Sequence, residues 1–280
     1  MAQARRADNT ITVPLPGGLI VTDRRLSHAE LRPLSGYEEE WLSRYRGQPS
    51  ALTTTGLLTA CLVGIGGAAV TDDLVRQLLV GDRDYLILSL RRMTLGDRFQ
   101  GVLPCPACDA RMDVSFNADH VPIERRLQTA DAYTLELGPP AERPRTIRFR
   151  LPTGGDQETV LGLDSAAAVD ALLDRCILDD GGTPLSLEDR AAVVAAMDRL
   201  APQLDLELDL ICPECGHGFL VPFDISAVFF HEMGINGAQL LRETHALALA
   251  YHWSEAEILS LDRERRRAYL GLLRETWAHE

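Results

Sequence analysis

Two short stretches decide the fold of this chain: Cys105-Pro106-Ala107-Cys108 and Cys212-Pro213-Glu214-Cys215. Each is a tight turn that presents two sulfurs, and one such turn fills only half of a tetrahedral coordination sphere. Two turns together supply four thiolates, which predicts one structural Zn²⁺ site held by Cys105, Cys108, Cys212 and Cys215. The pairs lie more than a hundred residues apart, farther than in compact zinc ribbons, so the site would join two distant parts of the chain.

Alternating apolar residues flank both turns, as is typical of strands. The first turn lies between Phe99, Val102 and Leu103 on one side and Met112, Val114 and Phe116 on the other. The second turn follows leucines at 204, 206, 208 and 210 that alternate with acids, and it leads into Phe219, Val221 and Phe223. Both cysteine turns are therefore predicted to be the tips of β-hairpins.

Two other interpretations of the four cysteines are independent redox pairs and plain buried thiols. A redox CxxC pair normally begins a helix that follows a strand. Strands leave both turns here, which argues against redox pairs. The single cysteines Cys61 and Cys176 sit in apolar helical patterns and are interpreted as small buried hydrophobic residues. His217 is interpreted as a solvent-facing turn residue, since four cysteines already complete the site.

The first hundred residues are predicted to be mainly helical. Residues 1–34 are expected to be irregular because of their prolines and glycines, with residues 19–21 pairing as a short strand. A helix is predicted near Ser35, with Tyr37, Trp41, Leu42 and Tyr45 on one face. Further helices are predicted over 51–64, from an N-cap at Thr71 through Val80 with a break at Gly81-Asp82, and over 84–93, where the pattern indicates burial.

The rest of the chain alternates between strand and helix patterns. Residues 133–151 are predicted to form a hairpin with its turn at 138–140. Helices are predicted to begin at Asp164 or Ser165 and at Ser186, where Asp189 completes a capping arrangement. Residues 236–280 are predicted to be helical, and their apolar positions recur at helical spacing. These residues either cover the body of the same chain or dock a partner, with Trp277 as a docking residue.

Composition excludes some classes of function. The chain has 280 residues, 46% of them hydrophobic, and a formal net charge of −13. Such an acidic protein repels nucleic-acid phosphates. The basic run Arg263–Arg267 is interpreted as a solvated helix face. No secretory signal is visible, and the longest apolar stretch, Leu57–Val70, is too short to span a bilayer. The sequence therefore predicts a soluble cytoplasmic protein with no nucleic-acid or membrane partner.

An enzyme interpretation is also available. His28-Ala29-Glu30 and Pro104–Cys108 together satisfy HxE…PCxxC, the signature of zinc deaminases. In such a site a histidine and two cysteines hold the metal, and a glutamate moves the proton. The gap between the two parts is unusually long, and the second cysteine pair would have no role. No P-loop, GxGxxG, HExxH or GxSxG motif is present, so we expect a protein that is not an enzyme.

These patterns predict an α+β fold: a mixed helical body, β-hairpins that form a zinc-ribbon-like module, and a helical C-terminal tail. The expected division places a mainly helical region at 1–97. A β-rich, zinc-ribbon-like region with an inserted hairpin and helices follows at 98–230. The helical tail covers 231–280.

Several stretches together resemble a known family. They are Leu31–Gly36 with the acidic helix after it, Gly81–Arg91, the first cysteine turn, the distant Cys212–Gly216 and Phe229-Phe230. In this order they resemble the T-even-type bacteriophage baseplate proteins, a family also found in bacterial contractile injection systems related to phage tails. The resemblance covers roughly residues 10–235. The stretch Ala250–Leu259 is similar to short helical phage-tail proteins, which suggests a fused module.

The resemblance implies a non-enzymatic structural component or assembly factor of a contractile, phage-tail-like baseplate hub. Its partners would be hub or spike proteins of the particle, and its location the bacterial cytoplasm or the particle itself. The residues alone leave an alternative open, a zinc-ribbon adaptor in an unrelated bacterial complex. The zinc deaminase is the less favoured alternative.

Overall fold

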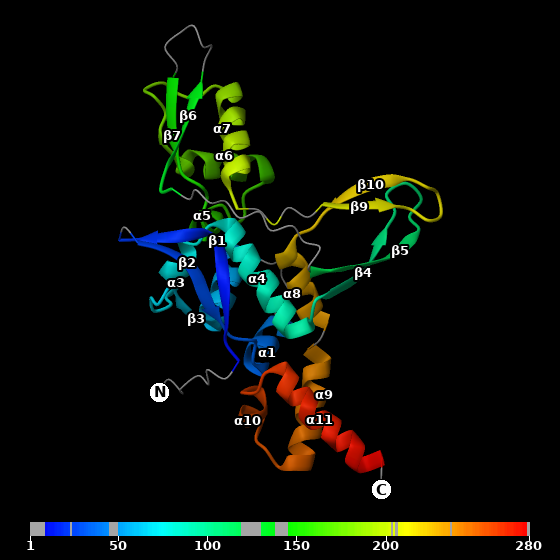
Figure 1. The fold of residues 1–280 in the computed structure, drawn as a ribbon. Helices are drawn as coiled ribbons and strands as arrows, with labels where there is room; N and C mark the ends of the chain where they lie inside the picture. The colour runs from blue at the N-terminus through cyan, green and yellow to red at the C-terminus, as the bar shows by residue number, and fades with distance from the viewer. Residues whose placement is uncertain are drawn as a thin grey trace.

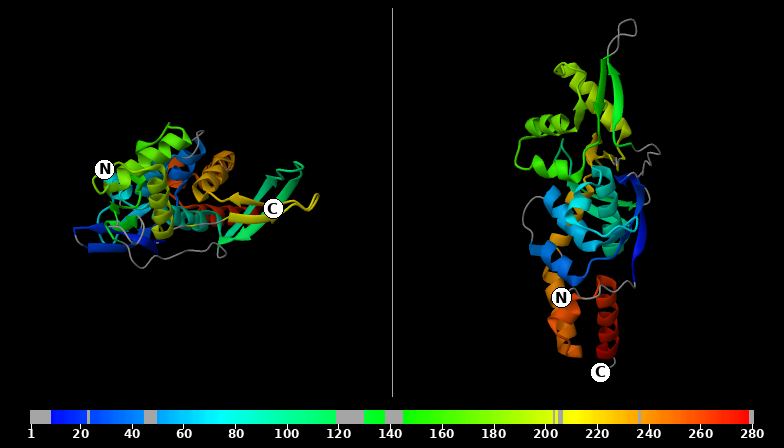
Figure 2. Two further views of the ribbon diagram at one scale, coloured as in Figure 1. Left: turned by 90° about the horizontal axis from the view of Figure 1, so that it is seen from above. Right: turned by 90° about the vertical axis from the view of Figure 1, so that its left-hand side faces the viewer.

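The computed structural model describes residues 9–22, 24–44, 50–118, 130–137, 145–202, 204, 207–235 and 237–278. The molecule is elongated (Figure 2), with a helical body in the middle, a mixed lobe at one end, a helical tail at the other, and an arm of two hairpins that projects sideways from the body (Figure 1). Helices combine with small antiparallel sheets, so the predicted α+β class is confirmed.

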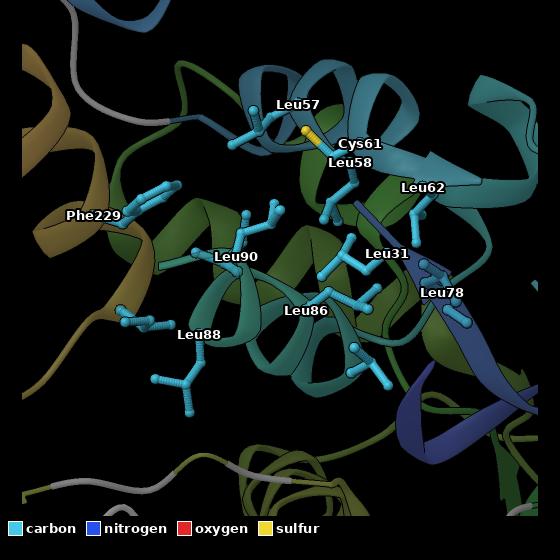
Figure 3. Close-up of a cluster of buried hydrophobic side chains, with 14 of the residues drawn as sticks. Leu31, Leu57, Leu58, Cys61, Leu62, Leu78, Leu86, Leu88, Leu90 and Phe229 are labelled. Atoms are coloured by element: carbon cyan, nitrogen blue, oxygen red, sulfur yellow. The ribbon is translucent and has the colours of Figure 1, made fainter. Parts of the chain in front are cut away.

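The body surrounds one long helix, α4 (Val80–Leu95), most of whose residues are buried, charged ones such as Asp82 and Arg91 among them. Around it lie the three-stranded sheet and the shorter helices: β1 (Ile11–Val21), β2 (Arg24–Leu31), β3 (Leu62–Ile65), α1 (Gly36–Arg44), α2 (Ala51–Cys61), α3 (Asp72–Arg76) and α8 (Ile225–Ile235). Figure 3 shows side chains from several of these elements converging on the core, among them Leu58, Leu90 and Phe229. All three are fully buried, so α4 is the buried helix that the sequence predicts over 84–93.

The expectation that residues 1–34 are irregular is wrong for the described residues, because β1 and β2 form an antiparallel pair. The prolines are accommodated because β1 is the edge strand of the order β1-β2-β3, and the pairing register shifts between Pro14 and Leu19. An edge strand tolerates proline since one side of its backbone needs no ladder partner. The predicted pairing of residues 19–21 is confirmed, with Leu19 opposite Leu26.

Some helices begin or end at other residues than the sequence predicts. Thr71 caps a helix as predicted, accepting a hydrogen bond from the Leu74 N–H, but α3 ends at Arg76. Gly81 and Asp82 do not break a helix; they lie in the first turn of α4. A β-carbon on Gly81 would lie 1.7 Å from the carbonyl oxygen of Pro202, so this turn needs glycine for close packing.

Two further expectations for the body are corrected. The helix predicted over 51–64 ends at Cys61, and β3 takes the following residues because they pair with β2. The predicted face of α1 is also wrong in part. Tyr37 and Trp41 are about half exposed, whereas Gly36, Glu39 and Leu42 are buried.

Asp82 joins β1 to α4, because its carboxylate accepts a 2.7 Å hydrogen bond from the Gly17 N–H in the protein interior. Burial raises the pKa of Asp82 to about 6, and this outweighs the lowering effect of the Gly17 N–H. Because the folded pKa lies above the unfolded one, the stability associated with Asp82 is greatest below pH 4 and falls as the pH rises toward 6.

We therefore expect the unfolding free energy of Asp82→Asn, relative to that of the wild type, to increase as the pH rises from 4 to 7.5. The expected increase is about 2 to 3 kcal/mol, on the basis of 1.4 kcal/mol per pKa unit. Urea unfolding at both pH values measures the difference. The control is Asp113→Asn, at an exposed position on a hairpin strand. A difference between wild type and Asp82→Asn that stays constant with pH contradicts the expectation.

The arm consists of two hairpins, β4 (Arg98–Pro104) with β5 (Arg111–Asn117) and β9 (Glu207–Ile211) with β10 (Gly218–Pro222). Both predicted hairpins are confirmed; part of the leucine-rich strand, at 205 and 206, lies outside the described residues. At the base of the arm, the rings of Phe99 and Phe116 stack with centroids 4.7 Å apart, and the ring of Phe223 meets both edge-on at 5.2 Å. Both hairpins are therefore anchored by one aromatic cluster.

The mixed lobe has its own core of Ile147, Phe149, Leu173 and Val193. Its elements are β6 (Tyr133–Leu137), β7 (Arg145–Phe149), β8 (Ile177–Asp179), α6 (Ser165–Cys176) and α7 (Leu187–Leu200). The short helix α5 (Gly154–Thr159) lies between the lobe and the body and packs on α2 and α3. The predicted hairpin and both helix starts are confirmed, with Asp164 capping α6 and a capping box of Ser186 and Asp189 on α7. The predicted turn at 138–140 lies outside the described residues.

The tail is helical as predicted, with α9 (Gly237–Tyr251), α10 (Glu255–Leu259) and α11 (Arg263–Ala278). Leu247, Ile258 and Leu273 form a small core within it, and α9 and α10 pack on α1. The side chain of Trp277 lies outside the described side chains. The basic run is not a solvated face throughout, because Arg263 and Arg266 are buried.

Candidate metal centre

The two cysteine turns have the same backbone hydrogen bonds. In the first, the Cys105 N–H donates to the Ala110 carbonyl, and the Asp109 N–H donates back to the Cys105 carbonyl, both at 2.9 Å. In the second, the Cys212 N–H donates to the His217 carbonyl, and the Gly216 N–H donates to the Cys212 carbonyl, again at 2.9 Å. In each turn, the residue that follows the second cysteine donates a hydrogen bond to the carbonyl of the first cysteine, and this bond closes the turn.

The closing residue of each turn is in the left-handed region, with φ of 59° at Asp109 and 73° at Gly216. Glycine adopts this region without strain, and aspartate is among the residues that tolerate it best. The turn folds back sharply at this point, so both cysteines of a pair lie on the same side of their hairpin tip. The sequence does not reveal this feature of Asp109, because no glycine marks the position.

The structure brings all four predicted cysteines together. Their sulfurs all lie within 4.8 Å of one another. The Sγ atoms of Cys105 and Cys215 are 3.7 Å apart, as are those of Cys108 and Cys212, so each close contact crosses from one hairpin to the other. A tetrahedral ion with Zn–S bonds of 2.3 Å requires S···S distances of about 3.8 Å, whereas a disulfide requires about 2.05 Å. The arrangement therefore suits four ligands around one ion.

The surroundings of the sulfurs are partly apolar. Cys105 and Cys212 are buried, and Met112, Leu210 and Phe219 pack around them. Cys108 and Cys215 are exposed. Backbone N–H groups of Cys215 and then of Glu214 lower the pKa of the Cys212 thiol, and thiolate is the form that binds metals. The cluster belongs to the arm alone and is separate from the core of the body.

The structure also places the other candidate ligands. His217 is exposed, and its ring stacks on Phe219 with a centroid distance of 6.0 Å, so it is a turn residue as predicted. His28 and Glu30 lie on β2, where His28 Nε2 is 3.5 Å from Glu30 Oε1. Among the described residues, the sulfurs beside Cys105 and Cys108 are those of Cys212 and Cys215, and His28 is not in the cluster.

Cys61 and Cys176 are buried in the body and in the mixed lobe, as the sequence indicates. Burial raises the pKa of the Cys176 thiol to about 11. Sequence reasoning missed a different group, the buried ions Glu39, Glu243 and Arg266 that join α1 to the tail. The sequence signal for this buried ion cluster is weak, because an arginine within a basic run is typical of a surface helix.

Within the described residues, no helix is long and apolar enough to cross a membrane. Residues 29–160 match the family model of the T4 bacteriophage base plate protein. The match includes the end of β2, the body from α1 to α4, the first cysteine hairpin, β6, β7 and α5, whereas β1 and α8 of the body lie outside it. Comparison with curated proteins gives no match, and comparison with solved structures gives none either.

Proposed function

Because residues 29–160 of this chain match the family model of the T4 bacteriophage base plate protein, we propose that the protein is a component of a phage baseplate. Its proposed role is that of a non-enzymatic structural part or assembly factor of the baseplate hub in a contractile, phage-tail-like particle. The observation that carries the proposal is the family match over the body. It is supported by the shape of the molecule, whose arm and tail extend away from that body (Figure 1). Such extensions offer surface for contacts with neighbouring components.

The ion in the arm is proposed to be Zn²⁺, held by Cys105, Cys108, Cys212 and Cys215. Four thiolates in a tetrahedral arrangement are the donor set that zinc takes in structural sites. The close inter-hairpin sulfur contacts support one shared ion rather than two separate pairs. The ion would hold the β4–β5 tip against the β9–β10 tip, and its chemistry would be that of a fixed cross-link.

The proposal that this is not an enzyme rests on the same donor set. A catalytic zinc keeps one position open for water or substrate, whereas four cysteines close the coordination sphere. The deaminase alternative needs His28 beside the first cysteine pair, and His28 instead faces Glu30 on β2. The unrelated zinc-ribbon adaptor remains the second candidate, since the arm alone would serve it equally well.

Hub or spike proteins of the particle are the proposed partners, and the bacterial cytoplasm or the particle itself is the proposed location. The acidic charge of −13 supports the absence of nucleic-acid partners. We also propose the division into a mainly helical region at 1–97, a zinc-ribbon-like region with its insertion at 98–230, and a tail at 231–280.

The test of the baseplate role is deletion and complementation in a strain that produces the particles. We expect deletion to abolish assembled baseplates, as counted by electron microscopy of purified particles, and the full chain to restore them. A tagged chain should also co-purify with hub or spike proteins. Normal numbers of contractile particles in the deletion strain would contradict the baseplate role and favour the adaptor.

A further inference from the structure

A groove of about 410 Å³ runs between α6 and α7 on the outside of the mixed lobe. It lies beyond the stretch that matches the baseplate family. Its apolar lining consists of Val169 and Leu173 of α6 and Leu187, Ala191, Val194 and Ala195 of α7. None of the four cysteines of the metal centre lines it.

Of the apolar residues that line this groove, Leu173 belongs to the core of the lobe, and the others lie outside the buried residues of that core. Val193 and Ala196 of α7 already face that core and are buried, as does Leu173 of α6. On the outer side, Leu187 is 86% exposed, Val169 53% and Val194 41%. Exposed apolar side chains that line one hollow are a feature of interaction sites.

The spacing of the lining residues suits a helix. Leu187, Ala191 and Ala195 follow one another at i, i+4 and i+8 along α7, and Val169 and Leu173 are at i and i+4 along α6. Two such rows leave a valley between them, and the small side chains of the alanines leave room for another backbone to approach closely. Amphipathic helices dock in grooves of this type through anchors at helical spacing.

The rim of the groove is acidic. Asp170, Arg190 and Asp198 line it, and Arg190 forms ion pairs with Asp170 at 3.0 Å and with Asp174 at 2.8 Å. The two carboxylates of Asp170 and Asp174 against the one guanidinium of Arg190 leave a formal charge of −1 at this edge. Asp170 and Asp174 remain about two-thirds exposed, so they can meet further cations. A chain whose own net charge is −13 is a poor occupant of such a groove.

We propose that the groove between α6 and α7 docks an amphipathic helix of a partner protein, with leucine-sized anchors on its apolar stripe and lysine or arginine on its flanks. The apolar stripe covers Val169, Leu187 and Val194 and fills the valley over Ala191. The basic flanks meet the carboxylates of the rim. This surface is independent of the metal centre and of the role in the baseplate.

The test uses two synthetic helical peptides of about 18 residues, long enough to cover the groove. Both carry leucines at i, i+3, i+4 and i+7, with lysine flanks in one and glutamate flanks in the other. Fluorescence anisotropy measures their binding to the full chain. We expect the lysine peptide to bind and the glutamate peptide to bind at least about tenfold more weakly, a difference of 1.4 kcal/mol.

Substitutions in the groove and at a distant position test whether the lysine peptide binds in the groove. Ala191→Arg fills the valley and opposes the basic flanks, so we expect it to weaken lysine-peptide binding by about tenfold or more. The control Ala238→Arg makes the same change at an exposed position of α9 and should bind like the wild type. Val194→Ser removes an exposed apolar contact with little effect on folding, and it should weaken binding by about threefold.

Three outcomes overturn the proposal. The first is equal binding of the lysine peptide to Val194→Ser, Ala191→Arg and the wild type. The second is equal binding, or no binding, of the two peptides. The third is a wild-type dimer in sedimentation velocity that Ala191→Arg dissociates, because the occupant is then a second copy of this chain.

Discussion

If the arm holds the proposed Zn²⁺, Cys105→Ser and Cys212→Ser are each expected to abolish zinc binding and to separate the two hairpin tips. The reason is geometric, since each variant leaves three sulfurs where the two hairpin tips meet, and structural zinc contributes folding energy directly, on the order of 10 kcal/mol or more in small zinc-binding peptides. Metal analysis of the purified wild type is expected to give about one zinc per chain. Either variant should give close to none.

The loss of structure in these variants should be confined to the arm. The cluster around Cys105 and Cys212 is separate from the core around α4, so we expect hydrogen exchange to increase in 98–117 and 207–222 while α4 stays protected. The same pattern is expected when a chelator strips the wild type. His217→Asn is the control, because His217 is exposed next to the site and supplies no sulfur. A metal-free wild type with equally protected hairpins contradicts the structural role of the ion.

Arg266→Ala is expected to destabilise the junction between the tail and the body by about 3 to 5 kcal/mol, the usual result of breaking a buried ion pair from one side. Arg266 is completely buried. Its guanidinium contacts Glu39 of α1 at 2.6 Å and Glu243 of α9 at 3.3 Å, and it donates to the Leu261 carbonyl at 2.8 Å. Removing it takes away the guanidinium that contacts both buried carboxylates directly and leaves them only the charge of the neighbouring Arg263.

Arg267→Ala provides the matched control, because Arg267 is the next residue of α11 and is exposed. Its change in unfolding free energy should stay within about 0.5 kcal/mol. Urea unfolding measures both variants, and hydrogen exchange over 237–278 shows whether the tail detaches first. Equal stability of Arg266→Ala and Arg267→Ala would mean that the buried ions do not hold the tail on α1.

The local elements were largely predictable because their signals are local. The alternating residues around the cysteine turns predict both hairpins, and the polar residues Thr71, Asp164 and Ser186 mark three helix starts that the structure confirms. The repeated cysteine pair predicts that four sulfurs meet, since one pair cannot complete a tetrahedron. Each of these inferences needs only a few neighbouring residues and their chemistry.

The incorrect predictions concern residues whose conformation or burial depends on a distant segment of the chain. Pro14 lies in a strand because β1 is at the sheet edge, and Gly81 lies in a helix because the Pro202 backbone packs against it. The burial of Arg266 follows from carboxylates on α1 and α9, which are far away in the sequence. The sequence by itself determined the hairpins, the helix starts and the four cysteines, because these depend on local periodicity and donor chemistry. Only the tertiary structure decided which strand is an edge, which charges are buried and where two helices leave a groove, because each depends on contacts between segments that no local pattern records.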